Sequence, residues 1–162
     1  MATAKRSANS ASEAAVRSPE VIERLCRDTA SAIDLYGQVK QAHWTVTGMN
    51  FIGVHELFDA QAMILSGHVD TLAERVRALG GVPSGTARQV ASLSTLDDLP
   101  VRELPSSEAI AEIAARYQAF GEGLLESAGM ASQAGDIATE DVYIEVIRSL
   151  DKQQWFLRSH LE

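Results

Sequence analysis

The positions of the four prolines constrain the fold of this chain more than any other feature of its sequence. Pro19 stands near the start, and the other three share the segment 83–105 of the 162 residues. Because proline breaks the interior of a helix, residues 20–82 and 106–162 are two long blocks in which helices can continue unbroken. Apolar residues in both blocks recur at spacings of three and four, which predicts an all-α fold.

Each block divides once, at a turn-forming sequence, which gives four long helices. The first block divides at Thr47-Gly48-Met49-Asn50 and the second at Gly135-Asp136. Ser18, directly before Pro19, is the expected N-cap of the first helix. The predicted helices cover about residues 19–46, 52–79, 107–134 and 137–161.

The connection between the second and third predicted helices is unusually long. At about 25 residues it exceeds a loop between neighbouring helices, so we expect it to cross the bundle, with a short helix near residues 94–99. A four-helix bundle with one long crossover has the ferritin-like topology. Residues 1–17 hold many small polar side chains and few apolar ones, so we expect a flexible tail before a single bundle domain over 18–162.

The net charge of −8 is unevenly distributed. Lys5, Arg6 and Arg17 against Glu13 give residues 1–17 a net charge of +2, which leaves −10 for the rest of the chain. An acidic body repels nucleic acid and concentrates cations. The sequence therefore predicts a small basic tail on an acidic body.

The sequence also indicates the compartment. No segment approaches the ~20 consecutive apolar residues of a membrane span, and the start lacks the apolar core of a secretory signal. The single cysteine, Cys26, excludes a disulfide within the chain, and its apolar neighbours predict a buried thiol. We therefore expect a cytoplasmic protein with no membrane partner.

Two imidazoles and three carboxylates, His43, His55, Asp59, Asp70 and Glu74, lie within 32 residues. On one helix the pairs His55/Asp59 and Asp70/Glu74 are each one turn apart, and all four fall on one strip. Asp59 and Asp70 are ~16 Å apart along the axis, too far to bind one ion. An antiparallel copy of the helix would bring Asp70 and Glu74 of one chain opposite His55 and Asp59 of the other. Two-fold symmetry would then create two equivalent sites. The spacing thus predicts a metal site between subunits.

Other metal motifs do not fit the chain. The stretch from His55 to Asp59 has an aspartate where a zinc protease helix needs its second histidine. None of the four histidines has a glutamate three positions before it, which excludes the Glu-x-x-His repeats of a di-iron centre inside the bundle. We therefore expect the chemistry at a surface.

The chain resembles the Dps family, the DNA-binding proteins from starved cells, in the segments KQAHWTVTGMNFIGVHELFDAQ, HVDTLAERVRALGGVP and LDKQQWFLRSHLE. The resemblance covers residues 18 to 162. It implies a hollow homo-dodecamer of ferritin-like bundles with ferroxidase centres at dimer interfaces. The implied ligands are His43, His55 and Asp59 from one subunit and Asp70 and Glu74 from its mate.

The implied chemistry is the oxidation of Fe(II) to Fe(III) and storage of the ferric mineral, with hydrogen peroxide preferred to oxygen. Mixed carboxylate and imidazole ligation suits Fe(II) and leaves positions open for an oxidant. Pairwise oxidation consumes both Fenton reagents without releasing hydroxyl radical, which protects DNA. Asp59 and Glu74 are the expected direct ligands, whereas Asp70 and the histidines either bind iron or orient the ligands that do.

Several of these residues allow a second interpretation. His43 taken alone is more typical of a core or helix-end histidine, and Trp44 is expected to pack, with a possible second role as a sink for oxidising equivalents beside the iron. Asp136, Asp141 and Glu145 are either a solvated helix start or, as the resemblance implies, the acidic ring of a three-fold pore where iron enters.

The remaining chemistry-bearing side chains match no ligand position. We expect His68 and His160 to be solvated or structural. Leu125 and Trp155 continue the apolar stripes of the last two helices, so we expect both in the core.

Two functions from different classes remain, an iron-oxidising store and a nucleoid-compacting protein in which iron chemistry is incidental. The tail discriminates between them. Lys5, Arg6 and Arg17 are few for phosphate neutralisation, although twelve tails on one particle would act together. Any DNA binding should therefore be independent of sequence and sensitive to salt, and would make the protein nucleoid-associated.

Overall fold

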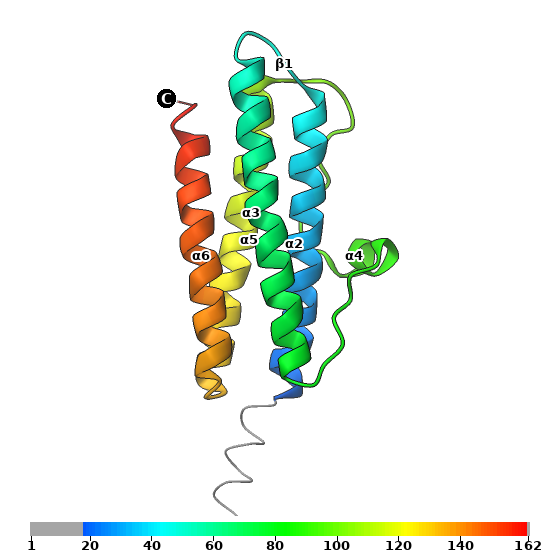
Figure 1. Ribbon diagram of the computed structural model, residues 1–162, viewed down its shortest axis with the longest axis vertical. Helices are drawn as coiled ribbons and strands as arrows, with labels where there is room; N and C mark the ends of the chain where they lie inside the picture. Colours follow the sequence, from blue (N-terminus) through cyan, green and yellow to red (C-terminus); the bar gives the residue numbers. More distant parts are fainter. Residues whose placement is uncertain (1–17, 162) are drawn as a thin grey trace, which may run out of the picture.

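The computed structural model describes residues 18–161, which form four long helices packed as a bundle and one short helix outside it (Figure 1). The predicted tail, residues 1–17, lies outside the described residues. The elements in chain order are α2 (Pro19–Thr45), β1 (Val46–Thr47), α3 (Phe51–Ala78), α4 (Ala87–Leu93), β2 (Leu104–Pro105), α5 (Ser106–Gln133) and α6 (Ile137–Arg158).

The four predicted long helices are confirmed. The first three match their predicted bounds to within one residue, and the fourth ends at Arg158 rather than near 161. The turns occur where predicted because glycines supply the left-handed backbone that ends a helix, with φ of 108° at Gly48, 88° at Gly80 and 73° at Gly135. Ser18 is the N-cap residue of α2, but its side chain makes no capping hydrogen bond.

The crossover is confirmed, and its short helix begins earlier than predicted. In Figure 1 the chain leaves α3 at one end of the bundle, passes through α4 beside α2, and reaches the opposite end before α5 begins. Thr86 and Gln89 form a capping box that starts α4 at Ala87. The predicted helix at 94–99 is wrong because groups of this segment bond to α2 and α5 and its backbone does not form the hydrogen bonds of a helix.

One arginine joins this crossover to two helices of the bundle. Arg116 on α5 donates from Nε to Gln38 Oε1 at 2.8 Å and from Nη2 to the backbone oxygen of Asp98 at 2.6 Å. Gln38 in turn donates to the backbone oxygen of Asp97 at 3.1 Å. Arg116 and Gln38 are both buried, so these bonds fix the path of the crossover along the bundle.

A short parallel pairing that the sequence did not predict holds the end of the crossover. Val46 pairs with Leu104 and Thr47 with Pro105. Ser106 Oγ then donates to the backbone oxygen of Thr47 at 3.0 Å. The turn between α2 and α3 and the start of α5 are therefore held together at one end of the bundle.

The core runs along the bundle between the four long helices, and two side chains expected in it are outside. Leu125 is 60% exposed and Trp155 is 58% exposed. On α6 the buried positions nearest Trp155 are Gln153 and Leu157, two residues to either side, so Trp155 faces away from the core. No helix in the described part of the chain combines the length and apolarity that a membrane crossing needs.

Candidate metal centre

Two imidazoles from different helices fix each other's orientation. His43, near the end of α2, has Nδ1 2.8 Å from the backbone oxygen of His55, and His55, near the start of α3, has Nδ1 2.8 Å from the backbone oxygen of His43. Their rings stack with centroids 3.7 Å apart. A carbonyl oxygen only accepts, so Nδ1 of each ring carries a proton and donates, and in the neutral form of each imidazole Nε2 holds the free lone pair. Metal-binding histidines are held in this way.

Asp59 lies one turn beyond His55 on the same face of α3. Its Oδ1 is 4.0 Å from His43 Nε2, and it accepts a hydrogen bond of 2.7 Å from Lys40 Nζ. That hydrogen bond and the charge of Lys40 hold the pKa of Asp59 below its ordinary value. The half-exposed carboxylate is therefore ionised and shared between an ammonium and an imidazole.

Lys40 and Asp59 border a groove between α2 and α3. Its volume is about 280 Å³, and it is lined by Tyr36, Lys40, Asp59, Ala62, Met63 and Ser66. The groove carries one cation and one carboxylate that already neutralise each other. A divalent cation that binds Asp59 therefore competes with Lys40 for the carboxylate.

Asp70 and Glu74 lie further along α3, and both are exposed. Within residues 18–161 of one chain, no three His, Cys, Asp or Glu side chains come close enough to hold a metal ion. The structure brings His43, His55 and Asp59 into one neighbourhood and leaves Asp70 and Glu74 apart from it. The single chain thus presents an incomplete set of ligands.

Trp44 and several apolar neighbours of this region are exposed. Trp44 is 67% exposed, so it does not pack within its own chain, contrary to the first expectation for it. Lys40 Nζ lies 5.8 Å from the centre of its ring, within range of a cation–π interaction. Other exposed apolar side chains on these two helices and the turn between them are Tyr36, Met49, Phe51, Ile52, Met63 and Ile64.

The three predicted pore residues differ in their surroundings. Asp136 caps the start of α6, accepting from the backbone nitrogen of Thr139 at 3.0 Å, and its Oδ1 lies 2.7 Å from Arg75 Nη2. It is 2% exposed, so it is neither solvated nor free. Asp141 and Glu145 are exposed. The pore stays a prediction, and these two are the members with accessible carboxylates.

The other titratable side chains singled out in the sequence have structural contacts. His68 Nε2 lies 2.7 Å from Ser149 Oγ and joins α3 to α6, and burial lowers its pKa. His160 is exposed. Cys26 is half-buried, with Sγ 3.5 Å from the backbone oxygen of Val82, and burial followed by the charge of Glu23 raises its pKa. The predicted tail cations, Lys5, Arg6 and Arg17, lie outside the described residues.

Lys40 is the one residue of this region that the sequence argument missed. It lies one turn before His43 on α2, so it falls on the same face of the helix. A search for cations one turn from each candidate ligand finds it. Its pairing with Asp59, across two helices, depends on how α2 and α3 pack.

The whole described chain is similar to proteins of one family. Residues 22–162 match the family described as ferritin-like domain. The chain is 37% identical to the DNA protection during starvation protein of Agrobacterium fabrum, with 88% of each chain covered. Dps from Mycobacterium smegmatis has a TM-score of 0.86 at 32% identity, covering 93% of this chain and 89% of its own. Dps from Thermosynechococcus elongatus has a TM-score of 0.86 at 28% identity, covering 93% and 95%. This chain therefore belongs to the ferritin-like family and, within it, to the Dps proteins.

Proposed function

We propose that this protein is a ferroxidase and iron store that oxidises Fe(II), with hydrogen peroxide in preference to oxygen, and keeps the ferric product inside a homo-dodecamer. The observation that carries the proposal is the reciprocal pair of hydrogen bonds between His43 and His55. It makes Nε2 of each ring the nitrogen available to a metal, and Nε2 of His43 lies 4.0 Å from the ionised carboxylate of Asp59, a ligand set of the kind that suits Fe(II).

Two chains complete each centre in this proposal. His43, His55 and Asp59 of one subunit supply one half of the ligands, and Asp70 and Glu74 of its two-fold mate supply the other. The exposed apolar side chains of α2 and α3, with Trp44 among them, are the surface that the mate covers. Asp59 and Glu74 are the direct iron ligands, and Asp70 and the imidazoles either bind iron or orient those that do.

Before iron binds, the ammonium of Lys40 is paired with Asp59 in the centre. This pairing neutralises Asp59, which limits the charge repulsion between the carboxylates of the two subunits. Fe(II) brings two positive charges where Lys40 brings one, so it can replace the ammonium at Asp59. The released side chain lies beside Trp44, whose ring face receives it.

The oxidation consumes two ferrous ions for each peroxide. Peroxide accepts two electrons while its O–O bond breaks, and two Fe(II) ions supply one electron each, so no hydroxyl radical is released. Trp44, next to the site, is available to take up single oxidising equivalents that escape.

Before this oxidation, Asp141 and Glu145 guide Fe(II) to the cavity through a pore between three subunits.

DNA protection is the second part of the proposal. The relatives named DNA protection during starvation proteins favour it. Removal of peroxide and Fe(II) protects DNA without contact, and the basic residues Lys5, Arg6 and Arg17 add a weak, salt-dependent attachment in the cytoplasm. Deletion of residues 1–17 should abolish any retardation of duplex DNA and leave ferroxidation intact. A truncated particle that still retards DNA at low salt would assign the contact to the acidic body.

The test of ferroxidation uses anaerobic protein loaded with Fe(II) and then mixed with peroxide or with oxygen. Ferric absorbance should rise at once with peroxide and more slowly with oxygen. The His55→Ala variant should lose most of the fast phase, and His160→Ala, which removes an exposed histidine just beyond the end of α6, should retain it. Equal rates in all three proteins, in particles of equal size, would refute the assigned centre.

A further inference from the structure

Two tyrosines are buried in the bundle, and only one has a partner for its hydroxyl. Tyr117 on α5 and Tyr143 on α6 are each 1% exposed. The hydroxyl of Tyr143 donates to Asp28 Oδ2 on α2 at 2.7 Å, whereas the hydroxyl of Tyr117 has no hydrogen-bond partner among the described residues. The two tyrosines are thus equally buried, but only the hydroxyl of Tyr143 has a hydrogen-bond acceptor among the described residues.

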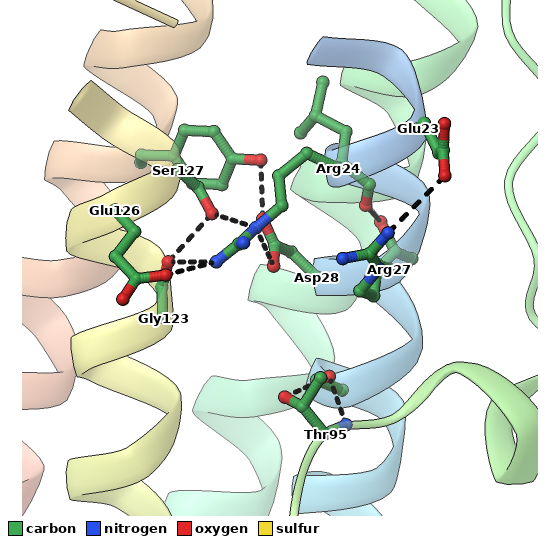
Figure 2. Close-up of polar contacts among 12 residues, drawn as sticks. Glu23, Arg24, Arg27, Asp28, Thr95, Gly123, Glu126 and Ser127 are labelled. Atoms are coloured by element: carbon green, nitrogen blue, oxygen red, sulfur yellow. Dashed lines mark hydrogen bonds and ion pairs between the residues drawn. The ribbon is translucent and has the colours of Figure 1, made fainter. Parts of the chain in front are cut away.

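Asp28 is positioned by an arginine that bridges two helices (Figure 2). Arg24 Nε lies 3.3 Å from Asp28 Oδ1 and 2.7 Å from Ser127 Oγ, and Nη2 donates to the backbone oxygen of Gly123 at 2.7 Å. Asp28 is 6% exposed, and burial raises its pKa even though Arg24, Ser127 and Tyr143 lower it. A carboxylate with a raised pKa is a stronger base for the proton of a phenol.

Asp28 also has a route to water. It lines a hollow of about 280 Å³ between α2 and α5 that opens to solvent beside Arg24, Thr95, Glu122 and Glu126. Two of these side chains, Glu122 and Glu126, are exposed carboxylates. A proton received by Asp28 can therefore leave the bundle, although the ring of Tyr143 is closed off from solvent.

Loss of an electron from a phenol makes its hydroxyl strongly acidic, so the proton must move in the same step. Tyr117 has no acceptor, and its oxidation would leave a positive charge in the apolar core, which is costly. Tyr143 has an acceptor in contact with it. We propose that Tyr143 is a redox-active tyrosine that gives one electron to a one-electron oxidant and its hydroxyl proton to Asp28.

The step balances without a further reactant. The phenolic O–H bond of Tyr143 breaks, an O–H bond forms on Asp28, and the electron reduces the oxidant, for example hydroxyl radical to hydroxide. Return of one electron from a reductant such as Fe(II), and of the proton from Asp28, restores both side chains. Tyr143 would thus convert a damaging single oxidation into the oxidation of one more ferrous ion.

The location of Tyr143 suits that role, which rests on the proposed ferroxidase function. Tyr143 is six residues into α6 and Glu74 four residues before the end of α3, so they lie about 9 Å and about 6 Å from the same end of the bundle. Arg75 and Asp136 tie these two helix ends together at 2.7 Å. Tyr143 and Glu74 are therefore at similar heights on two helices whose ends are joined.

The first test uses full-length, metal-free protein in which the exposed Tyr36, Trp44 and Trp155 are replaced by Phe. The two buried tyrosines are then its only tyrosines or tryptophans. A photogenerated ruthenium(III) polypyridyl complex serves as the one-electron oxidant, and freeze-quenched samples are measured by electron paramagnetic resonance. A neutral tyrosyl radical should form, fall at least tenfold with Tyr143→Phe, and persist with Tyr117→Phe, which also removes one buried hydroxyl.

The role of Asp28 has two readouts. Asp28→Asn keeps the size and an accepting oxygen but cannot take the proton, so the radical yield should fall at least tenfold. Because that variant risks misfolding, the parent protein is also measured after transfer to deuterium oxide. An exchangeable proton coupled to the tyrosyl oxygen should appear in its double-resonance spectrum. Absence of any tyrosyl radical, its loss with Tyr117→Phe instead, or absence of that coupling would overturn the proposal.

A second experiment separates this proposal from the ferroxidase function. Wild-type protein receives less Fe(II) than fills its centres, followed by peroxide, and both ferric absorbance and radical are recorded. Ferric product with a radical that Tyr143→Phe removes supports the protective role, and ferric product without it overturns that role. No ferric product, with the metal-free result intact, refutes the ferroxidase and retains the redox-active tyrosine.

Discussion

A single hydrogen bond decides what each imidazole of the candidate centre can do. With Nδ1 donating to a carbonyl oxygen, His43 and His55 each keep Nε2 as the ring nitrogen available to a metal. The pair is therefore held ready for a metal before any metal binds.

The matching carboxylate is held by Lys40, and removing that lysine should strengthen metal binding. In Lys40→Met the pKa of Asp59 should rise toward its ordinary value, and Fe(II) should bind about two- to fivefold tighter because it no longer competes with an ammonium for the carboxylate. Anaerobic calorimetry measures the change. Lys152→Met, which removes the same charge from α6, is the control and should leave the affinity as it is. Weaker binding in Lys40→Met would mean that Lys40 supports the centre rather than competes for it.

The long helices were predictable because most of their limits have a local cause. Pro19 starts α2, and Gly48, Gly80 and Gly135 follow the ends of three helices with positive φ. The position of α4 was less predictable. The segment after α4 is extended, and not helical, because Arg116 and Gln38 bind it, and both residues lie far from it in the sequence. Those bonds depend on residues about 20 and about 60 positions away in the chain.

Arg116 should therefore be the residue on which the crossover depends. Arg116→Met keeps the apolar stem but leaves Gln38 and the backbone oxygen of Asp98 buried without their donor, which should cost about 2–4 kcal/mol in the free energy of unfolding. Calorimetry at fixed protein concentration measures the stability, and amide hydrogen exchange should show faster exchange at residues 94–99. Arg88→Met on the exposed face of α4 serves as the control, and equal exchange in both variants would contradict the assignment.

At the scale of the whole molecule, the spacing of residues in the sequence predicted only part of the candidate metal centre. Helical spacing placed His55, Asp59, Asp70 and Glu74 on one strip of α3, and the structure agrees that one chain does not gather them. Neither Lys40 nor the hydrogen bonds of the imidazoles followed from spacing, because both arise where α2 packs against α3. The contribution of a second chain remains a prediction.

Mixed particles test that prediction. His55→Ala and Glu74→Ala damage the same centre from opposite subunits, so a mixed dimer carries one intact centre and one with both defects. In a 1:1 co-assembly with random pairing, the ferroxidase rate should recover to about a quarter of the wild-type rate. Mass spectrometry of intact particles verifies the mixing. A rate no higher than that of the separate variants would refute a centre shared between two subunits.

Entry of iron into the shell should depend on Asp141 and Glu145 and not on the free charge of Asp136. Asp136 is buried, caps α6 and is neutralised by Arg75, so its replacement would test the stability of the fold rather than the electrostatic field at the pore.

Changing Asp141 to Asn and Glu145 to Gln keeps the size of both exposed side chains and removes two charges from every chain around each three-fold axis. Uptake should slow when Fe(II) is scarce and match wild type when Fe(II) saturates, because only delivery is impaired. Removing the exposed charges of Glu20 and Glu23 at the start of α2 is the matched control. Stopped-flow ferric absorbance over a range of Fe(II) concentrations distinguishes the two regimes. An assembled double variant that takes up dilute iron at the wild-type rate would show that Asp141 and Glu145 are no more than the solvated first turns of α6, and that iron enters elsewhere.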